Sequence, residues 1–328
     1  MIKIHMLNVK QGDCFLFERS TSKSDRLTMI DICCGNLASE ELMKSSEAME
    51  SSKPHGNFGM CKKPTNPFSY MRNRYLTNVF RFILTHPDMD HMDGIRKLFE
   101  DLNVTNFWDC GIRREKPDFG GSPYDEDDWD FYDDLINGRV NDVTVVSPRS
   151  GSKGKFWNQD DDGGSGNGDY IQVVAPNEDL VELANENGDI NDASYVLVYR
   201  SSAGPIIFSG DSNDNTWEHI LDNHTNLVEN AAVLFAPHHG RKSKRSYEFL
   251  KVVKPRVTFF GCAPSDDLAY SGWNSRNLVY FTNNQCGNVH IYPDDKTVSV
   301  FIENGVYADA YTDKNTYQKD SFWYLDTF

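Results

Sequence analysis

Short apolar runs recur along the chain, and most of them have the length and composition of buried strands. The run 79–84 reads Val-Phe-Arg-Phe-Ile-Leu, and the run 231–236 reads Ala-Ala-Val-Leu-Phe-Ala. Short runs rich in β-branched and aromatic residues favour strands over helices. Helical spacing of apolar residues predicts helices at 95–102 and 217–221. Further strands are predicted at 2–6, 14–17, 27–33, 104–108, 171–175, 193–200, 205–209, 256–261, 289–292 and 298–302.

Three of these strands end in residues of the types that bind metals. The chain continues as Thr-His-Pro-Asp-Met-Asp-His after 79–84, as Gly-Asp after 205–209 and as Pro-His-His-Gly after 231–236. Such residues at the end of a buried strand need a partner, because an unpaired charge is costly away from water. A divalent ion is one such partner, and strand ends that converge on one sheet edge can build a site from distant sequence. The candidate ligands are His86, Asp88, Asp90, His91, Asp211, His238 and His239.

The overall charge narrows the range of partners. The chain has 328 residues, with 33 basic and 49 acidic side chains and a formal net charge of -16. Such a surface does not suit general coating of nucleic acid, so a polyanionic substrate needs a local basic patch or bound metal ions. The run Arg-Lys-Ser-Lys-Arg at 241–245 directly follows the last candidate ligands. Basic runs are often only solvated loops, but Arg241, Lys242 and Lys244 are candidates here for phosphate binding.

Cysteine usage and the absence of long apolar segments indicate a cytoplasmic protein. The seven cysteines form no C-x-x-C pair, which is typical of reduced thiols used as small core residues. His55 and Cys61 are expected at the surface. No early apolar run is long enough for a signal peptide or a membrane helix. A calcium site at Asp160–Asp162 is only weakly indicated, because the spacing of an EF-hand loop is absent.

The spread of the predicted strands favours one large domain. Residues 1–305 are expected to form it, with insertions at about 37–77 and 110–170 and a polar, aromatic tail at 306–328. The acidic run 124–134 predicts a helix or an ordered excursion with a solvated face. These acidic insertions are the part of the chain through which a protein partner would bind.

Three motifs occur in a fixed order: T-H-P-D-M-D-H-M-D-G at 85–94, F-S-G-D at 208–211 and A-P-H-H-G at 236–240. Together they resemble the metallo-β-lactamase fold, and more narrowly its ComEC-like branch of metallohydrolases. L-N-V-K-Q-G-D-C-F-L-F at 7–17 and N-D-A-S-Y-V-L-V-Y at 191–199 are similar to that branch as well. The resemblance implies an α/β fold, a four-layer αββα sandwich with its site at one edge.

The resemblance also implies a metal centre with one or two divalent ions, zinc or manganese. The implied ligands are His86 and Asp88 for one ion, Asp90 and His91 for the second, Asp211 as a bridge and His238 as the late histidine. Asp192 and His239 are further candidates, either as ligands or as neighbours of ligands. Many members of the fold have a histidine in place of Asp88 and another in mid-chain. The more carboxylate-rich set here shifts the preference toward harder ions, with zinc still open.

Metal-dependent hydrolysis is the function expected from such a centre. Divalent ions lower the pKa of bound water to about 7 and stabilise charge that develops on phosphorus. A phosphodiesterase or nuclease acting through a metal-bound hydroxide is therefore expected, with Asp90 as the catalytic carboxylate that orients the water. Its substrate would be a nucleic acid or a small phosphodiester, with no membrane partner. Two alternatives stay open: a hydrolase of neutral esters, thioesters or lactams on the same centre, and a non-catalytic protein that binds a partner through a degenerate site.

Overall fold

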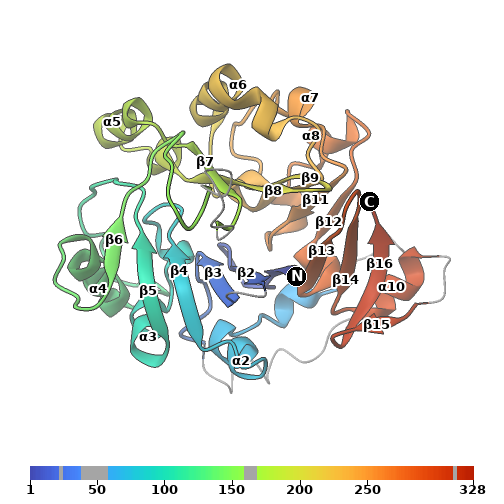
Figure 1. Ribbon diagram of the computed structural model, residues 1–328, viewed down its shortest axis with the longest axis horizontal. Coiled ribbons are helices and arrows are strands. Elements are labelled where there is room, and N and C mark those ends of the chain that lie inside the picture. Colours follow the sequence, from blue (N-terminus) through green and yellow to red (C-terminus); the bar gives the residue numbers. More distant parts are fainter. Residues whose placement is uncertain (22–24, 38–57, 159–167, 313–315) are drawn as a thin grey trace.

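Two β-sheets face one another at the centre of the molecule, with helices on their outer sides (Figure 1). The structure is a computed structural model that describes residues 1–21, 25–37, 58–158, 168–312 and 316–328. His55, which was expected at the surface, and Asp160–Asp162, where a calcium site was weakly indicated, lie outside the described residues.

The larger sheet contains β1 (Ile2–Met6), β2 (Phe15–Ser20), β3 (Asp25–Ile30), β4 (Asn78–Ile83), β5 (Asn103–Trp108), β6 (Thr144–Val146), β13 (Val289–Pro293), β14 (Val298–Ile302), β15 (Gln318–Lys319) and β16 (Phe322–Thr327). Their order across the sheet is β15-β16-β14-β13-β1-β2-β3-β4-β5-β6. The strands from β3 to β6 run parallel to one another. Ile30 pairs with Ile83, so β3 and β4 end side by side.

The smaller sheet contains β7 (Ile171–Ala175), β8 (Val196–Ser201), β9 (Gly204–Phe208), β10 (Val233–Phe235), β11 (Val257–Phe260) and β12 (Tyr280–Thr282). Their order is β12-β11-β10-β9-β8-β7. β8 and β9 form the hairpin expected from the sequence, and β9 runs parallel to β10. Phe208 pairs with Phe235, so β9 and β10 also end side by side.

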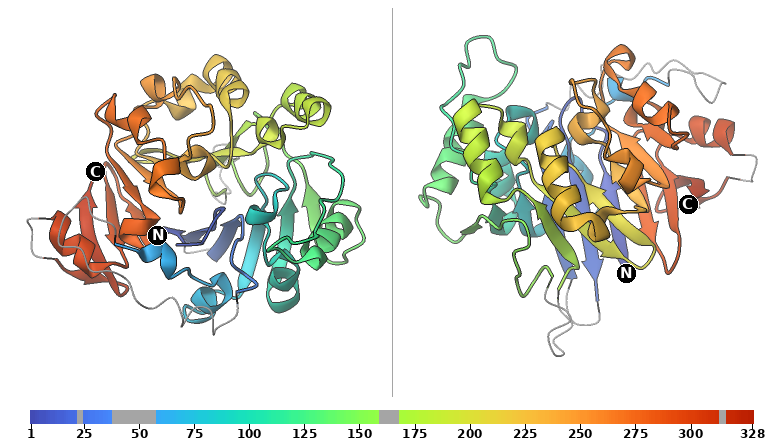
Figure 2. Two further views of the ribbon diagram at one scale, coloured as in Figure 1. Left: turned by 180° about the vertical axis from the view of Figure 1, so that it is seen from behind. Right: turned by 90° about the horizontal axis from the view of Figure 1, so that it is seen from above.

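Helices cover the outer faces of both sheets, as Figure 1 and the reverse view in Figure 2 show. On the side of the larger sheet lie α2 (Pro67–Arg72), α3 (Ile95–Asp101) and α4 (Glu126–Ile136). On the side of the smaller sheet lie α5 (Glu178–Asn187), α6 (Asp214–Val228), α7 (Leu250–Val253) and α8 (Tyr270–Asn274). At one end of the sandwich lie α9 (Asn283–Cys286) and α10 (Gly305–Tyr311). None of the helices in the described part of the chain is long and apolar enough to cross a membrane.

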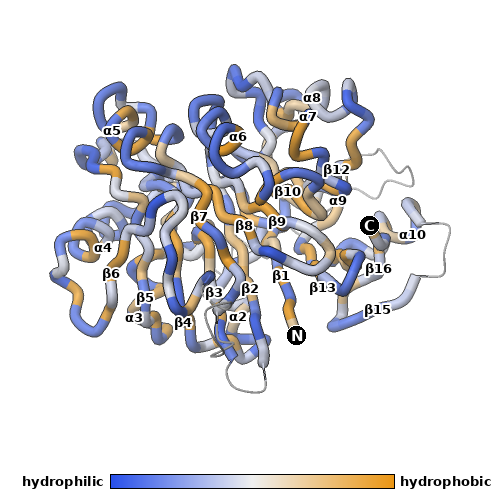
Figure 3. The backbone as a smooth tube through the Cα atoms, turned by 45° about the horizontal axis from the view of Figure 1, so that its top comes forward, coloured by the Kyte–Doolittle hydropathy of each residue, from blue (hydrophilic) through white to orange (hydrophobic). Residues whose placement is uncertain are grey.

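Three hydrophobic clusters fill the three interfaces between these layers. Ring pairs that join neighbouring layers are Phe15–Phe208 between the sheets, Phe82–Phe99 against α3 and Phe260–Trp273 against α8, with centroids 5.3, 6.2 and 4.7 Å apart. Figure 3 shows the same division, with hydrophobic strands inside and largely hydrophilic loops outside. Burial of apolar surface at every interface is the main stabilising contribution to such a fold. The architecture is therefore the four-layer αββα sandwich expected from the sequence.

Two strands of the larger sheet lie in the segment 306–328, for which the sequence predicts a polar, aromatic tail. β16 pairs antiparallel with β14, and β15 pairs with β16 at the edge of the larger sheet. Leu325 is fully buried between the sheets. Among the aromatic residues of this segment, Tyr307, Phe322 and Tyr324 are buried, whereas Tyr317 is exposed.

The expectation that all seven cysteines are reduced thiols is wrong. Cys61 and Cys262, which are 201 residues apart, form a disulfide. Cys61 is thus no free surface thiol, and it ties the segment before α2 to the end of β11. No sequence spacing could reveal this pair. The other five cysteines are free and buried, as expected for small core residues.

A buried ion cluster joins the two sheets away from the centre of the apolar core. Asp169, which is fully buried, accepts from Arg26 at 2.6 Å and from Arg81 at 3.2 Å, and lies 3.6 Å from Arg19. Burial lowers the pKa of Arg81 to about 10, although the Asp169 carboxylate opposes that shift. Asp169 belongs to a stretch rich in Gly, Ser and Asp. Its side chain is nevertheless buried, because its carboxylate provides the counter-charge for these guanidinium groups.

We predict that Asp169→Ala lowers the free energy of unfolding by about 3–5 kcal/mol, because it leaves buried guanidinium groups without a counter-charge. Asp295→Ala, which removes an exposed carboxylate from the turn between β13 and β14, is the matched control and is expected to change stability by less than about 0.5 kcal/mol. Urea unfolding followed by circular dichroism measures both. Equal stability of the two variants would contradict the role given to Asp169.

Candidate metal centre

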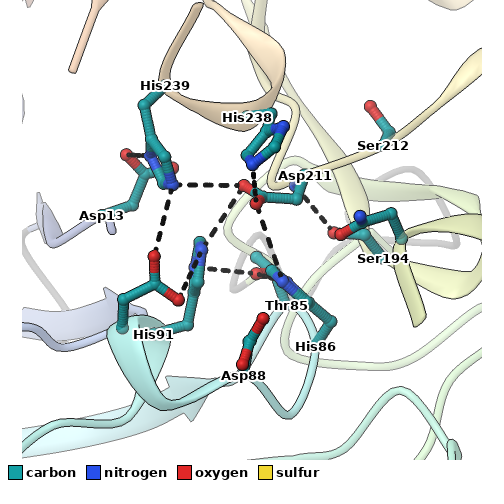
Figure 4. Close-up of polar contacts among 12 residues, drawn as sticks. Asp13, Thr85, His86, Asp88, His91, Ser194, Asp211, Ser212, His238 and His239 are labelled. Atoms are coloured by element: carbon teal, nitrogen blue, oxygen red, sulfur yellow. Dashed lines mark hydrogen bonds and ion pairs between the residues drawn. The ribbon is translucent and has the colours of Figure 1, made fainter. Parts of the chain in front are cut away.

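Four strand ends meet at one edge of the sandwich and carry the candidate ligands (Figure 4). In the larger sheet, β3 is followed by Asp31, and β4 is followed by the segment that contains His86. In the smaller sheet, β9 leads to Asp211 and β10 leads to His239. The ends of parallel neighbours lie at the same edge, so side chains far apart in sequence come together there. The convergence expected from the apolar runs is thus present.

The turns after β4 and β10 aim the side chains at this edge. β4 ends at Ile83, and Pro87, which cannot donate a hydrogen bond to a strand ladder, precedes the 3-10 turn η2 (Met89–His91). After β10, the turn η4 (Pro237–Gly240) holds His238 at φ 53° and His239 at φ 56°. The left-handed region is unfavourable for residues with a side chain, and such strain is concentrated at functional sites. This backbone directs the two adjacent imidazoles differently, with ring centroids 5.7 Å apart.

Gly210 allows Asp211 to approach the larger sheet. Its φ is +47°, and a Cβ atom there would lie 2.4 Å from Ser194 Oγ and 3.0 Å from Thr85 Cβ. Ser194 Oγ also accepts a hydrogen bond from the Asp211 backbone N–H at 3.0 Å. Any other residue at position 210 would push the Asp211 carboxylate away from β4.

The Asp211 carboxylate lies at the centre of the cluster. Its Oδ1 atom is 3.4 Å from His91 Nε2 and 3.5 Å from His239 Nε2. Its Oδ2 atom is 3.8 Å from His86 Nε2 and 3.5 Å from His238 Nε2. Each oxygen of Asp211 therefore faces a different pair of imidazoles.

Asp90 closes the cluster on one side. Its two oxygens lie 4.0 Å from His91 Nε2 and 3.8 Å from His239 Nε2. In the described part of the chain, the groups of side chains with metal-ligand spacing are His86/His91/Asp211, Asp90/His91/His239, Asp13/Asp211/His239 and Asp13/Asp31/His91.

Four buried atoms of this cluster have no hydrogen-bond partner among the described residues: His86 Nε2, His91 Nε2, His239 Nε2 and Asp211 Oδ1. Buried polar atoms are rarely left unpaired in a stable fold. Their separations are close to the distance of about 3.4 Å between two ligands that each lie about 2.1 Å from one ion in tetrahedral geometry. The donor set and its spacing therefore fit a divalent ion.

The electrostatics of the cluster also favour a cation. Burial alone would lower the pKa of His91, but Asp211, Asp31 and Asp90 raise it well above its usual value. Burial would raise the pKa of Asp211, but the imidazoles around it hold that pKa well below its usual range. The Asp211 carboxylate thus retains its charge and draws positive charge toward it. A divalent ion supplies that charge and releases the imidazole protons.

Asp13, Asp31 and Thr85 support the cluster and were not identified as site residues from the sequence. Asp31 Oδ2 is 2.8 Å from His91 Nδ1 and also accepts from Thr85 Oγ at 2.7 Å. Asp13 Oδ1 is 3.0 Å from His239 Nδ1. In the sequence, Asp31 and Thr85 directly follow apolar strands, and Asp13 lies in a Gln-Gly-Asp turn. These positions do not reveal which histidine ring each residue contacts.

Asp88, an expected ligand, and Asp192, a further candidate as a ligand or as a neighbour of ligands, lie apart from these groups of side chains. Asp88 belongs to none of the metal-type groups in the described residues, and its Oδ1 lies 3.5 Å from Arg114 Nη1. Asp192 is buried, but its two oxygens accept hydrogen bonds from Asn215 at 2.8 Å and Asn187 at 2.9 Å. The Asp192 carboxylate thus pairs with two side-chain amides around η3 (Ile190–Ala193) and belongs to none of the metal-type groups in the described residues.

The basic run after His239 divides into different environments. Arg241 lines a cavity beside the cluster. Lys242 Nζ donates to the Asp266 carbonyl at 2.8 Å, and Lys244 is exposed. Arg245 turns inward and donates to His238 Nδ1 at 2.8 Å. The run therefore contains both inward-facing and solvent-facing cations.

Several solved structures are similar to this fold at low identity. They include the metallo-β-lactamase fold protein YhfI from Bacillus subtilis, with a TM-score of 0.45 and 8% identity over 86% of this chain and 96% of that chain. CmlA, a diiron β-hydroxylase from Streptomyces venezuelae, has a TM-score of 0.40 and 12% identity over 79% of this chain and 44% of that one. A diphosphatase of the PhnP family has a TM-score of 0.36 and 9% identity over 80% and 86%. No protein-family model and no curated protein sequence matches the chain. These likenesses concern the overall fold and assign no role to any residue.

Proposed function

We propose that this chain is a metal-dependent hydrolase that cleaves phosphodiesters. The observation that carries the proposal is the set of buried, unpaired ligand atoms around Asp211. Divalent ions bound there would lower the pKa of a water molecule and neutralise the charge that develops on a phosphoryl group. The remaining task of the protein is to hold its imidazoles in the right tautomers and to position the water and the substrate.

Hydrogen bonds to Nδ1 assign the tautomers of two histidines. Asp31 accepts from His91 Nδ1–H and Asp13 accepts from His239 Nδ1–H. In the neutral rings that would bind an ion, both Nε2 atoms then carry a lone pair on the side of Asp211, and a carboxylate behind a ligating imidazole is the usual way to orient it. We therefore assign His91 and His239, with Asp90 and Asp211, to one metal position.

A third tautomer follows from Thr85. Its hydroxyl donates to Asp31 Oδ2 at 2.7 Å, so its oxygen is left to accept from His86 Nδ1–H at 3.1 Å. The His86 Nε2 lone pair then faces Asp211 Oδ2. We assign His86 and Asp211 to a second metal position, which has fewer protein ligands than the first.

His238 has the opposite tautomer. Arg245 donates to its Nδ1, and because a guanidinium has no acceptor, Nδ1 must carry the lone pair. The proton of a neutral His238 is then on Nε2, which faces Asp211 Oδ2 at 3.5 Å. We therefore propose His239, rather than His238, as the late histidine ligand, with His238 as a hydrogen-bond donor at the rim of the site.

Asp90 is the carboxylate best placed to act on a water molecule. Its side chain is 20% exposed, whereas the imidazoles of His91 and His239 are fully buried. Burial raises the pKa of Asp90 above its ordinary value, although His91 and His239 oppose that shift. A carboxylate with a raised pKa that reaches solvent can orient a water molecule and accept its proton.

We predict that Asp211→Ala abolishes metal binding and lowers phosphodiester hydrolysis by at least about 100-fold, because it removes the ligand shared by both positions. Elemental analysis of the purified proteins and hydrolysis of bis(p-nitrophenyl) phosphate measure the two effects. Asp88→Ala is the matched control and should retain its metal. A wild-type protein that binds no metal after reconstitution, or that cleaves no phosphodiester when loaded, would overturn the proposed function.

The neighbouring histidines provide a test of the ligand assignment. His239→Ala should weaken binding of one metal equivalent by about 10–100-fold or more, because it removes an assigned ligand. His238→Ala should retain the wild-type metal content. Isothermal titration with manganese or zinc distinguishes the two variants. Metal loss in His238→Ala with retention in His239→Ala would reverse the assignment.

The Asp31→Asn variant tests whether the carboxylate that orients the His91 ring is needed for metal affinity. The amide can donate to His91 Nδ1 and so move the ring proton to Nε2, where it blocks the metal position. We expect about a 10–100-fold loss of metal affinity with little change in the ligand set itself. Competition with a chromogenic chelator measures the affinity, and urea unfolding checks that the fold is intact. An unchanged affinity in a folded Asp31→Asn variant would show that this contact is not needed.

A further inference from the structure

We propose that a basic cavity beside the metal centre binds a second phosphate group of the substrate, next to the phosphodiester that is cleaved. This inference rests on the proposed function and specifies its substrate class. The cavity has a volume of about 580 Å³, and its walls include Lys10, Lys62, Arg241 and Tyr270. It is large enough to hold a nucleotide-sized group.

The charge of the cavity is opposite to that of the chain. The net charge of the chain is -16, yet none of the described residues that line the cavity is an aspartate or a glutamate. Lys10, Lys62 and Arg241 form no ion pair within the described part of the chain, whereas most arginines elsewhere in it do, as in the pair Arg96–Glu100. A concave surface with several unneutralised cations attracts anions and concentrates them.

Arg241 is the cation most firmly fixed in the wall. Its backbone forms a bridge with Leu268, its N–H donates to the His238 carbonyl at 2.9 Å, and its carbonyl accepts from Tyr247 Oη. Its Nε atom is buried and has no hydrogen-bond partner among the described residues. A buried donor without an acceptor is costly, and a phosphate oxygen is an acceptor that a guanidinium binds well.

The cavity and the metal centre are connected through neighbouring backbone segments. Gln11 lines the cavity, and the next residue, Gly12, packs so closely on the Asp90 carbonyl that an added Cβ atom would lie 1.7 Å from it. On the other side, the Gly261 N–H donates to the His239 carbonyl at 3.1 Å, and Cys262 then enters the cavity wall. One extended molecule can therefore occupy both the centre and the cavity.

The disulfide stabilises the wall that carries Lys62. Cys61 and Cys262 both line the cavity. Lys62 directly follows Cys61 in the turn η1 (Met60–Lys62). The covalent bond thus keeps this lysine near Arg241, although the two residues belong to distant parts of the chain. A site built in this way is set up before the ligand binds.

These features favour an oligonucleotide or dinucleotide over an ester with a single phosphate. In such a substrate, the phosphate next to the scissile one would enter the cavity. Tyr270 lies half-buried in the wall, stacked on Phe260 with the ring planes at 16°. An aromatic ring at this place can stack with a base without selecting its identity.

The test measures binding of fluorescein-labelled hexathymidylate to the full chain by fluorescence anisotropy, in the presence of a chelator so that no cleavage occurs. We expect Arg241→Ala to weaken binding about tenfold, as for loss of a charged hydrogen bond. Lys62→Ala should weaken it about threefold, as for an exposed cation. Each variant should also reduce the slope of log Kd against log salt by about 0.7, the contribution of one phosphate contact on a single strand.

Lys242→Ala is the matched control, because it removes a neighbouring cation of the same loop that does not line the cavity and whose ammonium group donates to the Asp266 carbonyl. Lys153→Ala controls for net charge at a distant exposed position. Both should bind within about twofold of wild type. Equal weakening by Lys242→Ala and Arg241→Ala would overturn the cavity as the binding site, as would a wild-type chain that does not bind the probe. Binding with the expected pattern but no cleavage on metal loading would refute the proposed function and leave the anion site standing.

Discussion

The position of the Asp211 carboxylate is the constraint on which the site depends. A fully buried carboxylate is unfavourable unless positive charge or hydrogen-bond donors surround it. The imidazoles of His86, His91 and His239 provide this environment, and they come from both sheets. The two sheets must therefore be packed in a register that brings the ends of β4, β9 and β10 together. The apolar core between the sheets fixes that register, and Gly210 provides the space for the final approach.

The turn that carries His238 and His239 has an unfavourable backbone conformation, which gives the cluster its geometry. Left-handed backbone at His238 and His239 costs roughly 1–2 kcal/mol per residue. Contacts around the turn hold it in place: His238 N–H donates to the Gly210 carbonyl at 3.0 Å, and Gly240 packs against Phe260. The benefit is that adjacent histidines receive different partners at Nδ1, a carboxylate for one and a guanidinium for the other. Two residues of the same type thereby acquire different chemistry.

The sequence was informative where local pattern determines structure. Apolar runs that are followed by His86, Asp211 or the His-His pair predict strands and the sheet edge where these strands end. This prediction is possible because an apolar run and the metal-binding residues after it are consecutive in the sequence. The sequence does not indicate which of His238 and His239 is the better candidate ligand, because this depends on the backbone angles of the turn and on the hydrogen bond from Arg245. Asp13 and Asp31 were missed for a related reason: their role is defined by which ring they contact. The Cys61–Cys262 pair and the strand at the C-terminus depend on tertiary packing over long separations.

The distribution of charge connects the centre to its substrate. An acidic chain repels polyanions at long range, so an anionic substrate gains from entering only where the local field is reversed. The cluster around Asp211 attracts cations, and the cavity lined by Lys10, Lys62 and Arg241 attracts anions. A neutral ester or lactam would gain nothing from three cations that form no ion pair with the described residues, whereas a phosphodiester with a neighbouring phosphate would interact with both the centre and the cavity. Under the proposed function, divalent ions held at the centre and the cations of the cavity would both attract a phosphate-rich substrate, which is the physical basis for proposing it over a neutral one.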